Sequence, residues 1–404
     1  MSFVVKKGSI FYATCLVTGT CIGVSFLSLP IVTGFTGFIP GILMSVIIWI
    51  FTLANAMFYA EATFGTPDGA NFYTISKTFL GKIPAIIVSI IFLINMYAYI
   101  GAYILSGVSS FNLLSEKFLG FRFPFFLGSI LYAFTFGVVV FCGIRVANRT
   151  NFIFLIGLVM AFLYTFYYQA AQVNTQYLTR IAWIYIYFSF PIIFSSFGFN
   201  LIIPTLCTYL HREKKKVQLS IFYGVTSALI FYIVWQWIIV GSMGKIPLWL
   251  SFSEGKEMTQ FPWGKEFPMV MRSLNCVILF AANTSVIGVT LSMIDFYSDC
   301  FSIPLTRRIY QTRFMICCLI FLPSLPIILL YHSPFIGKII NYAIVPGGSF
   351  IINAIVPIFM VAKARYFYKL PTPHFVPGGC YLLFLIGFAI FFLIYLQGIS
   401  ISVI

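Results

Sequence analysis

The chain has 404 residues, of which 61% are hydrophobic and only 8% are charged. Soluble domains carry about 25% charged residues, and a chain of this length keeps too large a surface to hide the difference, so the composition excludes a soluble globular protein and indicates contact with a lipid bilayer. The formal net charge of +15 does not indicate a nucleic-acid partner, because the basic residues lie in short loops between apolar segments, as the positive-inside rule predicts.

The apolar segments predict about 11 transmembrane helices, each with at least the roughly 20 residues that a helix needs to cross a bilayer. They cover residues 9–32, 37–60, 84–114, 124–144, 150–170, 181–209, 218–241, 268–298, 312–331, 335–361 and 377–400. Transmembrane β-strands would be about 10 residues long and would alternate in polarity. We therefore predict an all-α polytopic membrane protein in which residues 1–404 form a single integral membrane domain.

The distribution of Lys and Arg predicts the orientation. If the N-terminus is cytoplasmic, 16 of the 24 Lys and Arg residues fall on the cytoplasmic side and 8 on the outer side. This excess agrees with the positive-inside rule. With eleven spans, the C-terminus is then expected outside.

Two spans contain clusters of residues that weaken a helix at the depth of the bilayer centre. The first span contains TGTCIGVSFLSLP (18–30), and the sixth contains SFPIIFSSFGFNLIIP (189–204). The two spans lie five apart, and an odd number of spans per repeat inverts the second half relative to the first. This pattern predicts an inverted repeat with discontinuous helices, roughly 9–170 and 181–361, followed by an extra helix at 377–400.

A broken helix exposes N–H groups at one new end and C=O groups at the other, which attract anions and cations respectively. Two facing breaks can therefore hold a zwitterion or a substrate with its coupling ion. The residues expected in the first break are Thr18, Gly19, Thr20, Cys21, Ile22 and Gly23, and those in the second are Ser195, Ser196, Phe197, Gly198, Phe199 and Asn200. The alternative interpretation is that Gly and Ser only permit close helix packing.

Other polar residues lie inside spans. The third span contains Asn95, Tyr97, Tyr99 and Tyr103, and the eighth contains Asn283, Thr284 and Ser285. These side chains could bind a substrate or a small cation, or they could form hydrogen bonds between helices. Glu61, Asp295 and Asp299 end their spans toward the cytoplasm, so no carboxylate at mid-membrane is an obvious proton carrier.

Catalytic motifs are not apparent. The sequence has no HExxH motif, no phosphate-binding loop and no nucleophile elbow, so we expect neither an enzyme nor a bound metal or organic cofactor.

The stretches TGTCIGVSFLSLP, FSSFGFNLIIPTLCTYL, VWQWIIVGSMG and TSVIGVTLSMIDFYSDCF resemble the bacterial aromatic amino acid permeases, the tyrosine- and tryptophan-specific branch of the amino acid–polyamine–cation superfamily. The resemblance implies a leucine-transporter-type 5+5 inverted repeat with broken helices 1 and 6. It also implies secondary uptake of tyrosine or tryptophan across the bacterial inner membrane by alternating access. The implied coupling ion is H+ rather than Na+.

The resemblance also implies site residues, carried over by position. Substrate contacts would be Thr18, Gly19, Thr20, Gly23, Ser196, Phe197, Gly198, Phe199 and Asn200. From the residues themselves we further expect the substrate ring to pack against Phe197, Phe199 and the third-span tyrosines Tyr99 and Tyr103. Coupling-ion candidates are Thr20, Cys21, Thr284 and Ser285. The chain departs from the family at Val24-Ser25-Phe26, where Ala-Gly-Met is usual, and at Asn200-Leu201, where His-Gly is common.

Three alternatives stay open from the sequence. One is a sodium-coupled or aliphatic amino acid carrier of the same fold. The second is a channel, which would need rings of charges or carbonyl groups from symmetry-related chains. The third is a membrane-embedded transferase, which would need a buried His or acid. No oligomeric state follows from the sequence.

Overall fold

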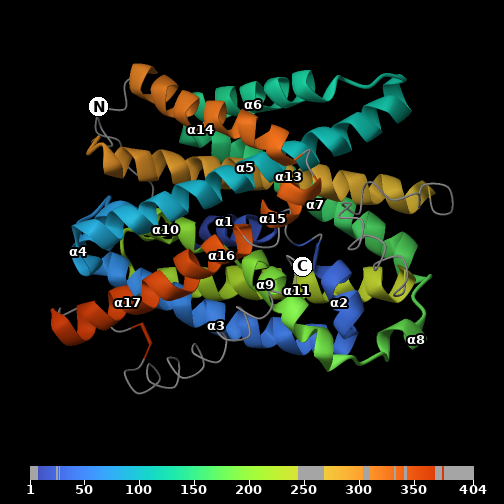
Figure 1. Cartoon of the computed structure of the whole chain (residues 1–404), viewed down its shortest axis with the longest axis horizontal. Coiled ribbons are helices and arrows are strands. Elements are labelled where there is room, and N and C mark those ends of the chain that lie inside the picture. The colour runs from blue at the N-terminus through green and yellow to red at the C-terminus, as the bar shows by residue number, and fades with distance from the viewer. Residues whose placement is uncertain are drawn as a thin grey trace.

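A computed structural model of the chain describes residues 8–23, 26, 28–243, 268–303, 310–331, 334–340, 344–368 and 375–376. Within these ranges every regular element is a helix, and most of the long helices run along the long axis of the molecule (Figure 1). Seven of the described helices are long and apolar enough to cross a bilayer, and three shorter apolar helices accompany them. The prediction of an all-α polytopic membrane protein is confirmed.

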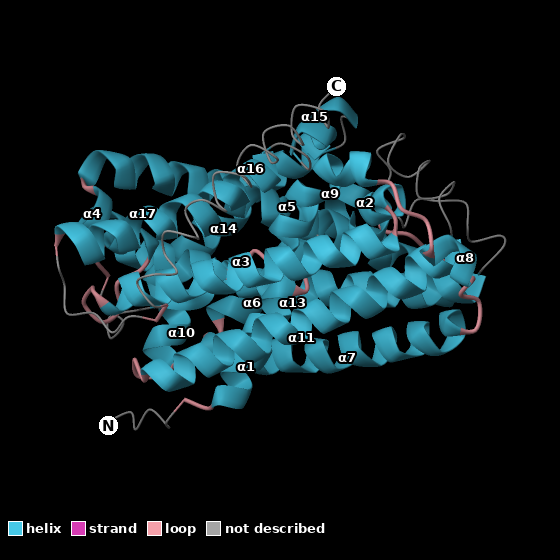
Figure 2. Ribbon diagram, turned by 90° about the horizontal axis from the view of Figure 1, so that it is seen from below, coloured by secondary structure: helices cyan, strands magenta, loops and turns pink. Residues whose placement is uncertain are grey.

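The helices of the first half coincide with the first five predicted spans. They are α1 (Ile10–Cys21), α2 (Leu29–Thr36), α3 (Phe38–Phe64), α5 (Lys82–Leu119), α6 (Phe125–Phe141) and α7 (Ile144–Ala170). Two short helices, α4 (Phe72–Leu80) and α8 (Thr175–Leu178), lie in the connections. The long helices α3 and α7 run nearly parallel in Figure 2.

The helices of the second half coincide with the sixth to tenth spans. They are η2 (Trp183–Tyr185), α9 (Ile186–Ser196), η3 (Asn200–Ile202), α10 (Ile203–Tyr209), α11 (Lys214–Met243), α13 (Pro268–Cys300), α14 (Tyr310–Tyr331), α15 (Pro334–Ile339), α16 (Val345–Phe350), η8 (Ile351–Ile355), α17 (Val356–Ala362) and η9 (Lys363–Phe367). The backbone of η8 and η9 is π-helical. The predicted eleventh span, 377–400, lies outside the described residues.

The corner between α2 and α3 depends on Gly37. Its φ is +94°, and a Cβ atom there would lie only 2.0 Å from the carbonyl oxygen of Arg180, so no side chain fits. The segment before η2 is also tied to this corner, because the Ala182 N–H donates to the Thr36 carbonyl at 2.8 Å. The chain that enters the second half is therefore fixed against the end of α2.

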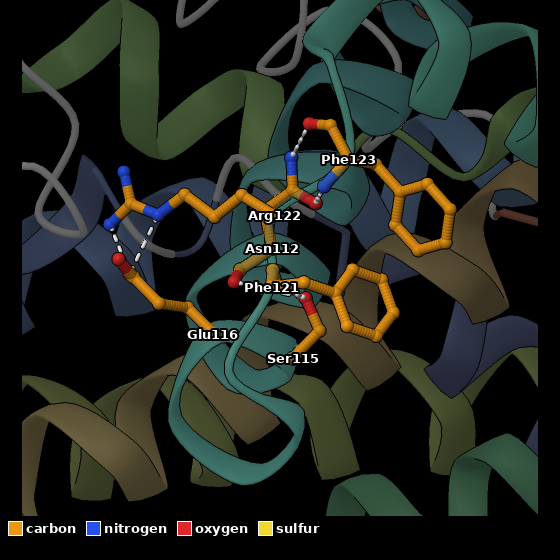
Figure 3. A network of polar contacts seen from close by, with 6 residues as sticks. All are labelled: Asn112, Ser115, Glu116, Phe121, Arg122 and Phe123. Carbon is orange, nitrogen blue, oxygen red and sulfur yellow. Dashed lines mark hydrogen bonds and ion pairs between the residues drawn. The ribbon is translucent and has the colours of Figure 1, made fainter.

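The connection between α5 and α6 is closed by a polar network (Figure 3). The Asn112 amide donates to the Phe123 carbonyl and accepts from the Phe123 N–H, both at 3.1 Å. Arg122 pairs with Glu116, whose carboxylate lies 2.6 Å from the Arg122 Nε. These contacts satisfy loop backbone groups at the end of the longest described helix.

The opposite end of the bundle carries a buried ion pair. Arg365 of η9 and Glu61 of α3 are 3% and 0% exposed, and their two hydrogen bonds measure 2.5 and 2.6 Å. Arg365 also donates to the Val376 carbonyl at 2.7 Å, and the Phe375 N–H donates to Glu61 at 2.8 Å. The pair thus joins α3, η9 and the chain segment that follows the tenth predicted span.

The loop after α10 is attached at the same end. Arg212 donates to the carbonyls of Thr66 and Pro67, both at 2.7 Å, and lies 3.3 Å from Asp68. His211 and Arg212 adopt left-handed backbone conformations, with φ of +52° and +54°. Since non-glycine residues rarely adopt this region, the three contacts of Arg212 hold a strained turn in place.

Candidate functional site

The first helix break is present, but it begins later than the sequence predicted. Thr18, Gly19, Thr20 and Cys21 form the last turn of α1, and the next described α-helix, α2, begins at Leu29. The expectation that residues 18–21 would themselves be unwound was wrong. In this turn the Thr18 hydroxyl donates to Thr14 O at 3.0 Å and also lies 3.1 Å from Gly224 O of α11, so Thr18 faces a neighbouring helix.

The unwound residues of the first break start at Ile22. Its ψ of 64° leaves the helical range, and the Gly23 N–H turns back to the Cys21 carbonyl at 2.7 Å. Phe26 is fully buried against Trp235 of α11, with ring centroids 5.2 Å apart. Val24 and Ser25, where the chain departs from its family pattern, lie outside the described residues.

The second break separates α9 from η3. Helix α9 ends at Ser196, and Phe197, Gly198 and Phe199 connect it to the short helical turn that begins at Asn200. The Ser196 hydroxyl donates to the Ile192 carbonyl at 2.9 Å, so Ser196 belongs to the helix rather than to the unwound segment. The break is therefore shorter than predicted, and glycine is its central residue.

The two breaks are joined by a residue that sequence reasoning missed, Tyr232 of α11. Its hydroxyl lies 2.6 Å from the Cys21 carbonyl and 2.6 Å from the Ser196 carbonyl, which are the last residues of α1 and α9. Both carbonyls lie at helix C-termini, where partial negative charge accumulates. The single hydroxyl proton of Tyr232 cannot form a full hydrogen bond with both carbonyls at once. The two carbonyl oxygens therefore retain the capacity to accept a hydrogen bond from another donor. A tyrosine inside an apolar span was the one available signal, but it does not single out Tyr232 because the chain has 24 tyrosines.

The third and eighth predicted spans meet the first break at Gly23. A Cβ atom on Gly23 would lie 3.0 Å from the Tyr103 hydroxyl and 3.3 Å from the Ser285 Oγ. The rings of Tyr103 and Tyr99 stack at 6.0 Å with an interplanar angle of 9°. The structure thus brings together Gly23, Tyr103 and Ser285, three predicted site residues from three predicted spans.

Other predicted polar residues hold helices together instead. Asn95 donates to the Val345 carbonyl at 2.9 Å, and Tyr97 donates to the Leu319 carbonyl at 2.6 Å. Asn283 accepts a hydrogen bond from Tyr132 of α6. For these side chains the structure shows the interhelical hydrogen bonds that the sequence had left as the alternative to ligand binding.

Two of the three hydroxyls among the coupling-ion candidates are engaged within their own helices, whereas the Ser285 Oγ has no hydrogen-bond partner among the described residues. Thr20 donates to the Leu16 carbonyl at 2.8 Å, and Thr284 donates to the Ala281 carbonyl at 2.9 Å. The Thr20 Oγ lies 3.4 Å from the position that a Cβ on Gly288 would take, so α1 and α13 are in contact there. Their oxygen lone pairs can still ligate a cation. Among the described residues, no three His, Cys, Asp or Glu side chains form a metal-ligand cluster.

Two further residues that the sequence did not single out border the second break. A Cβ on Gly198 would lie 3.3 Å from Ser349 Oγ and 3.5 Å from Asn353 Nδ2. Asn200 donates through its side-chain amide to the main-chain carbonyl of Asn353 at 2.9 Å. The PGGSFIIN stretch could have pointed to Ser349 and Asn353, because its polar and glycine residues interrupt an apolar span.

The phenylalanines of the second break are core residues in this structure. Phe197 and Phe199 are both 0% exposed. The Phe197 ring packs edge-to-face on Tyr232, with centroids 5.0 Å apart and an interplanar angle of 76°. Phe197 therefore supports the tyrosine that joins the two breaks.

This combination of two facing breaks in a bundle of apolar helices coincides with a family match. The profile of the tryptophan/tyrosine permease family matches residues 6–396. The chain belongs to this family. A tryptophan-specific transport protein of Haemophilus influenzae is 27% identical over 96% of this chain and 94% of its own length. The low affinity tryptophan permease of Escherichia coli K12 is 27% identical over 93% and 91%, and the tyrosine permease of Enterobacter agglomerans is 26% identical over 90% and 89%.

A solved structure shows the same fold at low sequence identity. It is MHP1, a transporter of the nucleobase-cation-symport-1 family, in a closed conformation with bromovinylhydantoin bound. The TM-score is 0.66 at 13% identity, and the match covers 98% of this chain and 91% of that one. The predicted leucine-transporter type of fold is confirmed, and the chain is a multi-pass membrane transporter.

Proposed function

We propose that this permease is a secondary active symporter that imports an aromatic amino acid, tyrosine or tryptophan, by alternating access. The observation that carries the proposal is the junction at Tyr232, where the C-terminal ends of two broken helices meet within the membrane domain. Discontinuous helices with facing ends form substrate sites in inverted-repeat transporters. The printed functions of the relatives, tryptophan and tyrosine transport, supply the class of substrate.

The polar ends of an amino acid fit the polarity of the broken helices. The ammonium group would bind at the Cys21 and Ser196 carbonyls, which already share a single hydroxyl proton. The carboxylate would bind at the amino end of α2, because the first N–H groups of a helix have no intrahelical partner. The substrate ring would lie beside Tyr99 and Tyr103, whose stacked rings border the first break.

The coupling ion in this proposal is a proton. A sodium site would need oxygen ligands from Thr20, Cys21, Thr284 and Ser285. The Thr20 and Thr284 hydroxyls already donate within their own helices, and the resemblance to the aromatic amino acid permeases favours H+. The protein would reside in the inner membrane with its N-terminus in the cytoplasm, as the charge distribution predicts.

Transport in proteoliposomes tests the proposal. Labelled tyrosine and tryptophan are supplied outside, with and without an inward proton gradient, in media that contain or lack sodium. We expect saturable uptake that persists without sodium, collapses with a protonophore, and exchanges with unlabelled substrate loaded inside. Uptake that requires sodium would refute the coupling, and transport of aliphatic amino acids alone would refute the substrate class. Flux without exchange would favour a channel.

A further inference from the structure

The second break is bordered by four polar side chains that come from three segments of the fold. They are Tyr99 of α5, Asn200 of η3, Ser349 of α16 and Asn353 of η8, and we call them the α16 polar cluster. Their exposed fractions are 7%, 0%, 0% and 4% in that order. Burial of a polar group costs free energy unless the group forms a hydrogen bond, so a buried atom of this cluster without a partner is a candidate ligand contact.

The orientation of Asn200 is fixed by its partner. Its Nδ2 lies 2.9 Å from the main-chain carbonyl of Asn353, and a carbonyl can only accept. The Asn200 Oδ1 must therefore face away, and it has no partner among the described residues. Asn200 thus presents a buried hydrogen-bond acceptor beside the break.

Two other members of the cluster also have side-chain atoms without a hydrogen-bond partner. Asn353 Nδ2 donates to Ser349 Oγ at 2.8 Å, while Asn353 Oδ1 has no partner among the described residues. The Tyr99 side chain adjoins Ser349, but its hydroxyl does not reach hydrogen-bond geometry with any described group. Three buried polar atoms of the cluster therefore lack hydrogen-bond partners among the described residues, and two of them are amide oxygens that only accept.

The backbone that presents Asn353 is specialised. Residues 351–355 form a π-helical turn directly after α16, a feature that often occurs at functional sites. Helix α16 packs very closely on α5, since a Cβ on Gly348 would lie 2.4 Å from Asn95 Nδ2. The glycine therefore allows the π-helical turn to approach the helix that carries Tyr99.

Gly198 of the break lies beside this cluster. It is partly exposed although the residues around it are buried. The position of its missing Cβ lies 3.3 Å from Ser349 Oγ and 3.5 Å from Asn353 Nδ2, and it lies 2.9 Å from the Ser195 carbonyl oxygen. The backbone of the break thus approaches the cluster to contact distance, with no room for a side chain between them.

We propose that the α16 polar cluster is a side-chain subsite that accepts a hydrogen bond from the aromatic ring of the substrate, namely the phenol O–H of tyrosine or the indole N–H of tryptophan. The inference rests on the proposed function, because it assigns the ring end of the same ligand. Phenylalanine has no ring donor and would leave the acceptors buried and unsatisfied, which is the most effective way for a site to reject an analogue.

The proposal is tested with Asn353→Leu, which removes the side-chain acceptor but keeps the main-chain carbonyl that binds Asn200. Ser349→Ala is the second variant, in case the first does not insert. The control is Asn275→Leu, because Asn275 is also buried at 6% exposure with an unpartnered Oδ1. It lies ten residues before Ser285 along α13, about 15 Å along the helix axis.

The readout is the KM of uptake for tyrosine and tryptophan, and the inhibition constant of phenylalanine against each. In both variants we expect the KM of the preferred substrate to rise about tenfold, as for loss of one hydrogen bond. Phenylalanine binding should be unchanged or tighter, and Asn275→Leu should resemble the unmodified protein. An equal loss for all three amino acids would assign the cluster to the shared head group or to structure and would overturn the inference. The inference would also be overturned if uptake stayed intact and the KM of the preferred substrate kept the same ratio to the inhibition constant of phenylalanine in the variants. If the unmodified protein carries neither tyrosine nor tryptophan, the proposed function fails first, and the inference fails with it.

Discussion

Replacing Tyr232 with Phe removes one oxygen atom from the junction of the two helix breaks. The ring remains, so the edge-to-face contact with Phe197 at 5.0 Å is preserved. The change deletes the contacts of 2.6 Å to the Cys21 and Ser196 carbonyls. Tyr232→Phe is therefore a selective test of whether the junction holds the two half helices together.

The expected magnitude follows from counting protons and acceptors. One hydroxyl proton forms one full hydrogen bond at a time, and such bonds between transmembrane helices contribute about 0.6 kcal/mol on average and up to about 1.7 kcal/mol. The Cys21 carbonyl would keep the Gly23 N–H at 2.7 Å. The Ser196 carbonyl would lose its contact with Tyr232, and a buried unsatisfied carbonyl costs about 1–3 kcal/mol. We expect a loss of about 1.5 kcal/mol in the state that joins the breaks, which corresponds to a roughly tenfold fall in uptake rate if transport passes through that state.

The assay combines initial rates of uptake in proteoliposomes with thermal unfolding of the purified protein in detergent. Tyr223→Phe is the matched control, since Tyr223 lies on the same helix with 51% of its surface exposed. We expect the control to behave as the unmodified protein. If Tyr232→Phe kept both the uptake rate and the unfolding temperature, the Tyr232 hydroxyl would not stabilise the contact between the two helix ends. That result would refute the reasoning.

Three further results are expected. Glu61→Gln and Arg365→Met should each lower the free energy of unfolding by about 3–5 kcal/mol, because each leaves its buried partner unpaired, and the double variant should lose less than the sum in a denaturant titration. Gly198→Ala should abolish most uptake, since its Cβ would lie 2.9 Å from a backbone carbonyl, whereas Gly19→Ala, with its nearest atom at 4.0 Å, should retain uptake. Cys142, which is exposed after α6, should react with a membrane-impermeant thiol reagent only in inverted membrane vesicles if the N-terminus is cytoplasmic.

Each of these expectations has its own control and contrary outcome. The control for the buried pair is Glu116→Gln, which breaks the ion pair with Arg122, whose side chain is 57% exposed, and should cost at most about 1 kcal/mol. If the losses from Glu61→Gln and Arg365→Met simply added in the double variant, the two buried residues would not be energetically coupled. Equal uptake by the two glycine variants would contradict the packing argument. Labelling must disappear in Cys142→Ser, and labelling in right-side-out vesicles would reverse the predicted orientation.

Much of the fold could be predicted because the relevant physics is local in sequence. Apolar runs near 20 residues specify membrane helices whatever surrounds them, and glycine weakens a helix wherever it lies. The clusters at 18–30 and 189–204 therefore revealed both breaks, and the family resemblance agreed with them. Their boundaries were less certain, because α1 continues through Thr18 to Cys21 and α9 continues to Ser196, and tertiary context can override the weak helix propensity of these residues.

The sequence by itself determined that this chain is an all-helical membrane transporter with two broken helices and that its family carries aromatic amino acids. Only the tertiary structure decided that Tyr232 joins the breaks, that Asn353 and Ser349 border Gly198, and that Glu61 is buried against Arg365. Those contacts join residues far apart in the chain: Tyr232 follows Cys21 by 211 positions, and Arg365 follows Glu61 by 304. Hydropathy measures how each segment partitions into lipid, whereas these contacts depend on which helix faces lie together, and that is set by packing across the whole bundle.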